Sequence, residues 1–228
     1  MKVILFGATG MIGQGVLREC LLDPEVTNVL SVARRTTGKT DPKLREIVHD
    51  DFSDFSSLAN ELTGYDACFF CLGVSSAGMS EADYTRVTYD VAVAAAKTLV
   101  ERNPGLTFVF VSGTGTDSSE RGGTMWARVK GKAENAILAM PFKASFVMRP
   151  AAIQPMHGET SRATITRVGY ATLGWLFPVI KAAFPKLVTT TERLGRAMLV
   201  LAKHGSSKRV LESTDIDELG RHAELEPS

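Results

Sequence analysis

Short apolar runs and amphipathic stretches alternate along the first 150 residues. Val3 to Phe6 is an apolar run that ends at a glycine, a pattern typical of a parallel strand buried on both faces. From Met11 to Leu22 apolar positions recur every four residues, which predicts a helix that ends before Asp23-Pro24. The further predicted strands are 26–33, 46–49, 67–72, 106–111 and 144–148, and the further predicted helices are 55–62, 81–103 and 125–140.

This order of elements predicts the fold class. Consecutive parallel strands need crossover connections, and these connections are almost always right-handed. The chain is therefore predicted to form an α/β fold, a doubly wound parallel sheet with helices on both faces.

The regular alternation ends after Arg149-Pro150. Residues 151–163 are predicted to be an irregular segment, rich in small and polar residues, and residues 164–184 an apolar helical stretch interrupted by Pro178. A helix at 191–203, a strand at 209–212 and a polar tail are predicted to follow. We expect a single domain over residues 1–228, with a core at 1–150 and a small helical C-terminal lid at 151–228 that serves as a substrate or partner region.

Charge and hydropathy argue against a nucleic-acid partner and against a membrane-spanning segment. The 26 Lys and Arg residues and the 25 Asp and Glu residues leave a formal charge of +1, and no run of five like charges occurs, so no nucleic-acid partner is expected. The longest uncharged stretch, Val3 to Leu17, contains four glycines and is shorter than the ~18 apolar residues of a membrane span. No transmembrane segment is therefore expected.

The cysteines bear on the compartment. Cys20, Cys68 and Cys71 are an odd number in a chain of 228 residues, which argues against a disulfide scaffold and for a reducing compartment. Cys68 and Cys71 have the spacing of a redox motif, but residues three apart on a strand point to opposite faces, so we expect two core thiols. The first residues do not resemble a signal peptide. We expect a cytoplasmic protein.

A glycine-rich turn connects the first predicted strand to the first predicted helix. In it, Gly7 allows a sharp turn, Gly10 lets the backbone approach a pyrophosphate, and Gly13 permits close packing of helix on strand. The N–H groups and the dipole of the helix N-terminus favour phosphates. The alternative is a glycine-rich turn without a ligand. The sequence favours a dinucleotide site in the 1–150 core, formed by Gly7, Thr9, Gly10, Met11, Ile12 and Gly13.

The end of the second predicted strand indicates which dinucleotide fits. Chains that bind NAD usually place Asp or Glu about 20 residues after the glycines, but this chain has Arg34 and Arg35 there. Guanidinium groups can bind a 2′-phosphate in a bidentate manner, whereas a carboxylate would repel it. NADP (as NADPH) is therefore favoured, unless both arginines are merely solvated at the strand end.

Several further motifs support a family resemblance, namely Asp51-Phe52, Cys71-Leu72-Gly73, Val111-Ser112, residues 129–134 and Arg149-Pro150. With the glycine turn, they resemble the extended and atypical short-chain dehydrogenase/reductase superfamily, which has an NAD(P)-binding Rossmann fold and includes epimerase- and dehydratase-like enzymes. Within it, the sequence is most similar to the NmrA-like and Tat-interacting-protein-like branch, over residues 1 to about 155.

The resemblance implies roles for individual residues. Asp51 and Phe52 would border the adenine, and Lys130 would hold the hydroxyls of the nicotinamide ribose. Cys71, Leu72 and Gly73 would line the adenosine ribose and the pyrophosphate.

The same resemblance leaves the activity open. Active members have a proton-donating Tyr four residues before this Lys, and a Ser at the end of the fifth strand orients the substrate carbonyl. Ser112 and Lys130 match and are the catalytic candidates, but Trp126 occupies the Tyr position, and an indole N–H does not shuttle protons at neutral pH. Ser112, Thr114 or a water remain as alternative donors.

The histidines and the apolar stretch carry weaker signals. The four histidines share no i,i+4 spacing, so no metal site is expected; His157 is the one near the expected substrate region. Residues 168–180 carry no charge and are rich in aromatic side chains. They are expected to cover the substrate pocket or, less favoured, to form a partner or dimer surface or a peripheral membrane contact.

Two functions therefore remain. The first is an NADP-dependent oxidoreductase with weak activity on a small apolar carbonyl. The second is a catalytically impaired NADP(H)-sensing protein that binds a protein partner. The identity of the substrate or partner, and the choice between monomer and homodimer, stay open.

Overall fold

The computed structural model describes residues 1–159 and 188–225 and shows a seven-stranded sheet in the order β3-β2-β1-β4-β5-β6-β9. Every neighbouring pair in this sheet is parallel, which confirms the predicted α/β doubly wound class. In sheet order, the strands are β3 Leu44–Val48, β2 Asn28–Ala33, β1 Lys2–Phe6, β4 Ala67–Phe70, β5 Thr107–Val111, β6 Ala144–Arg149 and β9 Val210–Glu212.

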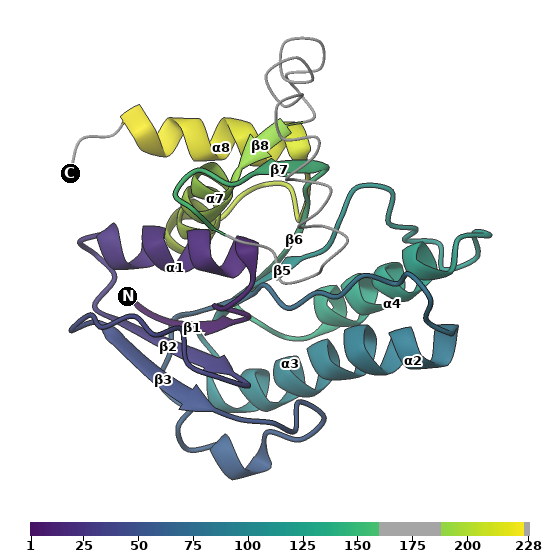
Figure 1. The fold of residues 1–228 in the computed structure, drawn as a ribbon, viewed down its shortest axis with the longest axis horizontal. Helices are drawn as coiled ribbons and strands as arrows, with labels where there is room; N and C mark the ends of the chain where they lie inside the picture. Colours follow the sequence, from purple (N-terminus) through teal and green to yellow (C-terminus); the bar gives the residue numbers. More distant parts are fainter. Residues whose placement is uncertain (160–187, 226–228) are drawn as a thin grey trace.

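Helices cover both faces of the sheet (Figure 1). On one side lie α1 (Met11–Leu22) and α7 (Thr191–His204), with α8 (Ser213–Leu225) packed on α7. On the other side lie α3 (Val91–Arg102) and α4 (Met125–Ala139). Each side has its own hydrophobic cluster. Cys68 of β4 belongs to one cluster, and Cys71, the residue after β4, packs against the other, so the two thiols lie on opposite faces as predicted.

Helices α1 and α7 pack unusually closely because each has a glycine at their contact. A Cβ added at Gly15 would lie 2.6 Å from the Cβ of Thr191, and one added at Gly195 would lie 2.8 Å from the Cγ of Glu19. Helix α7 thus shares a core with α1, and β9 extends the main sheet. Residues 188–212 are therefore integrated with the first 150 residues, whereas the predicted helical stretch at 164–184 falls outside the described residues.

The helix predicted at 81–103 is present but is not uniform. It comprises α2 (Glu81–Thr85), a π-helical turn η2 (Arg86–Asp90) and α3. The sequence spacing of Val87, Val91 and Ala95 predicts that they share one buried face of this helix, but the wider turn shifts the helical repeat and the prediction is wrong for Val87. Val87 is 41% exposed, whereas Ala95 is fully buried.

Three other predictions are corrected by the structure. The helix predicted at 55–62 is only a short 3₁₀ turn, η1 (Ser56–Leu58), because Asp54 accepts hydrogen bonds from the N–H and hydroxyl of Ser56 and so competes with helix formation. The irregular segment after Pro150 contains β7 (Ala152–Gln154), which pairs in parallel with β8 (Val188–Thr190). The polar tail is largely α8.

Candidate functional site

The glycine turn between β1 and α1 is built from close backbone contacts. Gly7 has φ +86°, and a Cβ there would lie 2.8 Å from the backbone carbonyl of Cys71. The carbonyl of Gly7 accepts a hydrogen bond from the N–H of Gly10 at 2.9 Å. A Cβ on Gly13 would lie 2.0 Å from that same carbonyl oxygen. Gly7 and Gly13 are therefore required by the fold itself, whether or not a ligand binds.

Gly10 is different, because the fold leaves space beside it. An added Cβ would meet only the carbonyl oxygen of Gly7, at 3.4 Å, and the backbone of Gly10 is extended. Gly10 is the N-cap of α1, with no side-chain cap and no acidic residue in the first turn. The positive end of the helix dipole is thus not neutralised by the chain, as a phosphate site requires. Thr9, Met11 and Ile12 are half-buried around it.

Arg34 and Arg35 follow the end of β2 and are both exposed. The carbonyl of Ala33 before them accepts a hydrogen bond from the N–H of His49 at 3.0 Å, which ties the end of β2 to the residue after β3. Within the described residues, neither guanidinium forms a hydrogen bond or an ion pair. Both are therefore free to bind an anion at the strand end.

Asp51 and Phe52 lie just beyond β3. The hydroxyl and N–H of Ser53 donate to Asp51 at 2.5 and 2.9 Å, and these hydrogen bonds lower the pKa of the Asp51 carboxyl. Phe52 packs edge-on against Phe6 and Phe55. The structure thus gives both residues defined positions at the carboxyl edge of the sheet, where α/β folds bind ligands.

The segment after β4 runs beside the glycine turn. The N–H of Cys71 donates to Phe6 at 2.9 Å, and its carbonyl is the group that a Cβ on Gly7 would meet. Burial raises the pKa of the Cys71 thiol well above its ordinary value, so the thiol is neutral. Gly73 is exposed and has open space around it. The structure therefore brings the backbone of Cys71 and Leu72 next to Gly7, on the glycine turn.

Ser112 and Lys130 lie on the same face of the sheet. Ser112 directly follows β5 and, because strand residues alternate, faces the same side as Phe110. The ammonium of Lys130 lies over the Phe110 ring, 6.0 Å from its centroid. Burial lowers the pKa of Lys130, an effect that Glu134 partly opposes. The Lys130 ammonium has no hydrogen-bond partner in the described part of the chain, so a ligand can supply one.

Trp126 lies one helical turn before Lys130 on α4. Its six-membered ring packs on Gly115, where an added Cβ would be 3.4 Å from Cη2, and Gly115 has φ +87°. The indole N–H forms no hydrogen bond within residues 1–159 and 188–225. Position 126 therefore offers a hydrogen-bond donor but no group that can exchange a proton at neutral pH.

Thr116 is a site residue that the sequence did not reveal. Its hydroxyl donates to the carbonyl of Gly113 at 2.8 Å and contacts the Ser112 hydroxyl at 3.0 Å. Thr114 donates its hydroxyl hydrogen to the carbonyl of Arg149 at 2.9 Å. No sequence pattern signals these hydrogen bonds, since they depend on the path of the loop after β5. They engage two of the hydroxyl groups considered as alternative proton donors.

A buried ion pair holds α4 against the sheet. Glu134, fully buried, binds Arg149 at the end of β6, with one N–H···O distance of 3.1 Å. Such a two-point pair fixes orientation as well as distance. It thereby fixes the helix that carries Trp126 and Lys130.

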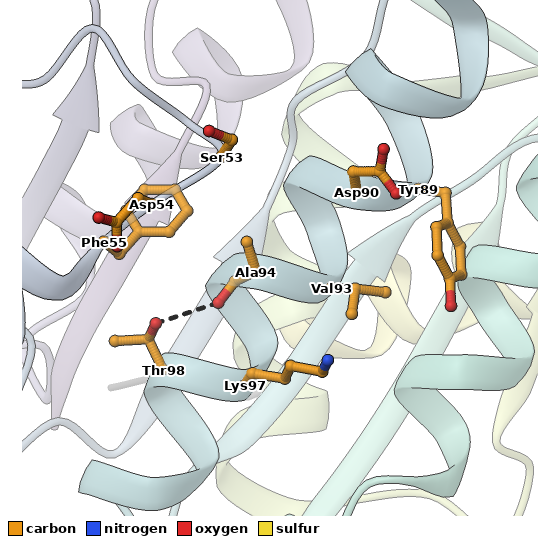
Figure 2. A pocket seen from close by; sticks show the side chains of 9 residues that line it. All are labelled: Ser53, Asp54, Phe55, Tyr89, Asp90, Val93, Ala94, Lys97 and Thr98. Carbon is orange, nitrogen blue, oxygen red and sulfur yellow. Dashed lines mark hydrogen bonds between the residues drawn. The ribbon is translucent and has the colours of Figure 1, made fainter. Parts of the chain in front are cut away.

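A cavity of about 430 Å³ lies elsewhere, between the residues after β3 and α3. Figure 2 shows Phe55 on one side and Val93 and Lys97 of α3 on the other. None of the predicted site residues lines it, so we do not include it in the candidate site.

In the described part of the chain, no group of three His, Cys, Asp or Glu side chains is placed to hold a metal ion, and no helix could cross a membrane.

Lys130 yields a prediction with two effects of opposite sign. Lys130→Met removes an ammonium that burial disfavours, so we expect a higher free energy of unfolding without cofactor. The same change should weaken NADPH binding roughly tenfold, through loss of a charge-assisted hydrogen bond. Thermal denaturation and fluorescence titration measure the two effects. Lys132→Met is the matched control, because Lys132 is exposed on the same helix; equal effects in both variants would contradict the assignment.

Comparison with known proteins supports a dinucleotide-binding family. A protein-family model described as NAD(P)H-binding matches residues 7–167. "Protein fmp52, mitochondrial" of Aspergillus niger is 30% identical over 180 residues, which cover 75% of each chain. "Protein fmp52-2, mitochondrial" of Aspergillus oryzae is 25% identical over 95% of this chain and 96% of the relative.

Solved structures show the same fold at low sequence identity. A short-chain dehydrogenase family protein from Francisella tularensis has a TM-score of 0.69 at 14% identity and covers 94% of this chain and 98% of that one. The Bordetella bronchiseptica enzyme WbmF, in complex with NAD⁺, has a TM-score of 0.68 at 15% identity and covers 98% of this chain and 77% of the enzyme. The neighbours confirm the predicted NAD(P)-binding Rossmann fold, as found in short-chain dehydrogenases, while the NmrA-like branch stays a prediction.

The names of the relatives correct one expectation. They are mitochondrial proteins by name, so the expected cytoplasmic location is wrong. The free thiols Cys20, Cys68 and Cys71 indicate only that disulfides are not used, which does not distinguish one reducing compartment from another. Taken together, the glycine turn, the parallel sheet and the match over residues 7–167 show that the chain belongs to the NAD(P)H-binding family with a short-chain dehydrogenase/reductase-like Rossmann fold.

Proposed function

We propose that this protein binds NADP(H) and is catalytically impaired, so that it acts as an NADP(H)-sensing protein with weak carbonyl reduction at most. The observation that carries the proposal is Trp126, which stands one turn before Lys130 where a proton-donating tyrosine is expected. The bound cofactor would supply a hydride, but the new alkoxide would find no tyrosine on α4 to protonate it, because Trp126 stands at that position and Lys130 would bind the cofactor ribose.

The chain's own groups fit the cofactor. The uncapped N-terminus of α1 and the open space at Gly10 fit the pyrophosphate. Arg34 and Arg35 would bind the 2′-phosphate, and Lys130 the nicotinamide ribose. The remaining residues of the proposed cofactor site are Gly7, Thr9, Met11, Ile12, Gly13, Asp51, Phe52, Cys71, Leu72 and Gly73.

Replacement of the two arginines tests the choice of dinucleotide. We expect the unmodified protein to bind NADPH at least about ten times more tightly than NADH, because each charge-assisted contact contributes roughly 1.5 to 3 kcal/mol. Replacing both Arg34 and Arg35 by Ala should remove this preference and leave NADH affinity unchanged. Calorimetric titration with both cofactors measures it. Equal affinities in the unmodified protein would refute the assignment to NADP.

A carbonyl panel tests the catalytic part of the proposal. Steady-state oxidation of NADPH is measured with aldehydes, ketones and quinones, after cofactor binding has been shown by fluorescence. We expect rates at least 10²-fold below the ~10 s⁻¹ median of enzymes, which is the usual cost of a missing general acid. A rate near that median would favour the alternative, an NADP-dependent oxidoreductase that acts on a small apolar carbonyl with another proton donor.

Partners and location are part of the same proposal. A protein partner suits a sensing role, and the net charge of +1 gives no support to a nucleic-acid partner. The names of the relatives support a mitochondrial location for this chain. Analytical ultracentrifugation would distinguish a monomer from a homodimer.

A further inference from the structure

The three hydroxyl groups that follow β5 all have their hydrogens engaged by acceptors of the chain. The Thr116 hydroxyl has one hydrogen, which it donates to the carbonyl of Gly113 at 2.8 Å. The 3.0 Å contact between Thr116 and Ser112 is then satisfied only if Ser112 is the donor. Thr114 donates to the carbonyl of Arg149. Toward a ligand, these hydroxyls therefore offer lone pairs rather than hydrogens.

Helix α4 offers the opposite kind of group. The ammonium of Lys130 and the indole N–H of Trp126 are both donors, and neither has a hydrogen-bond partner in the part of the chain that the structure describes. Lys130 is committed to the cofactor ribose in the proposed function, which leaves Trp126 for a second ligand. The ring of Trp126 packs on Gly115, which lies between Thr114 and Thr116 in the loop after β5. The indole ring of Trp126 is thus held against the loop that carries the three hydroxyl groups.

From this pairing we infer that the ligand group recognised beside the cofactor is an alcohol rather than a carbonyl. A hydroxyl can donate to the oxygen of Ser112 and accept from the N–H of Trp126, so it satisfies both sides. A carbonyl only accepts, so its binding to Ser112 requires the Ser112–Thr116 hydrogen bond to break. Thr116 is then a positioning residue that sets the direction of the Ser112 hydroxyl. This inference rests on the proposed cofactor site.

The test compares an alcohol with the ketone of the same skeleton. Dissociation constants of cyclohexanol and cyclohexanone are measured by ligand-observed NMR on protein saturated with NADP⁺. One net hydrogen bond corresponds to about 2- to 10-fold in affinity, and we expect cyclohexanol to be favoured by that factor. Thr116→Val removes the acceptor for Ser112 and keeps the N–H that also binds the Gly113 carbonyl at 3.2 Å. In this variant the alcohol preference should disappear.

Thr116→Ser is the matched control, since it restores the hydroxyl and should restore the alcohol preference. A purely structural role of Thr116 would change both dissociation constants together and leave their ratio unmodified. The inference is overturned if cyclohexanone binds as well as cyclohexanol to the unmodified protein, if Thr116→Val keeps the original ratio, or if neither probe binds. NADP⁺ affinity is titrated first, so its absence refutes the proposed function, whereas intact cofactor binding with no alcohol preference refutes only this inference.

Discussion

Gly10→Val is expected to lose dinucleotide binding while the protein stays folded. The fold tolerates a side chain at Gly10, because its backbone is extended and an added Cβ would meet only the carbonyl oxygen of Gly7, at 3.4 Å. The valine side chain would instead fill the space that the pyrophosphate needs. Loss of two charge-assisted hydrogen bonds predicts at least a roughly 100-fold fall in NADPH affinity. Fluorescence titration measures affinity, and circular dichroism reports the fold.

Two other glycines serve as controls for this variant. Gly113→Ala has open space around the added Cβ and should bind NADPH normally. Gly13→Val should instead unfold the protein, because a Cβ at Gly13 would lie 2.0 Å from the carbonyl oxygen of Gly7. Unchanged NADPH affinity in a folded Gly10→Val variant would show that the cofactor does not lie on this turn.

Trp126→Tyr is expected to create the acid that the site lacks. The new phenol would stand one turn before Lys130, whose ammonium increases the acidity of a nearby phenol. A positioned general acid contributes typically 10²- to 10⁴-fold, so NADPH-dependent carbonyl reduction should rise by about 10²-fold or more. Initial rates with saturating NADPH measure the change.

Trp126→Phe is the control, because it keeps an aromatic ring and supplies neither a hydroxyl nor an N–H. It should show no gain in rate. If Trp126→Tyr binds NADPH but reduces carbonyls no faster than the unmodified protein, the loss of tyrosine does not limit the activity.

The elements that position the cofactor could be predicted because their signals are local. Helix α1 has the predicted bounds, since Gly10 precedes it and Asp23-Pro24 ends it. The order of parallel strands follows from the alternation of strand and helix. The family resemblance predicts that Ser112 and Lys130 lie close together. The contact between the Lys130 ammonium and the Phe110 ring supports this, because Phe110 and Ser112 face the same side of the sheet.

The parts that could not be predicted depend on contacts between distant segments or on single rotamers. Strands β7 and β8 are three residues each and pair across a long gap in sequence, so neither shows a periodic pattern. A short 3₁₀ turn stands in place of the helix expected at 55–62, because the Asp54 side chain accepts hydrogen bonds from Ser56. The hydrogen bond between the Ser112 and Thr116 hydroxyls depends on the path of the loop after β5, which no spacing of residues encodes.

The most direct test of the account is a calorimetric titration of the unmodified protein with NADPH. The central claim is that the N-terminus of α1, with Arg34 and Arg35, forms an NADP(H) site. The account predicts saturable binding of NADPH, with NADH at least about ten times weaker at the same ionic strength. Absence of saturable binding of NADPH, or tighter binding of NADH, would contradict it.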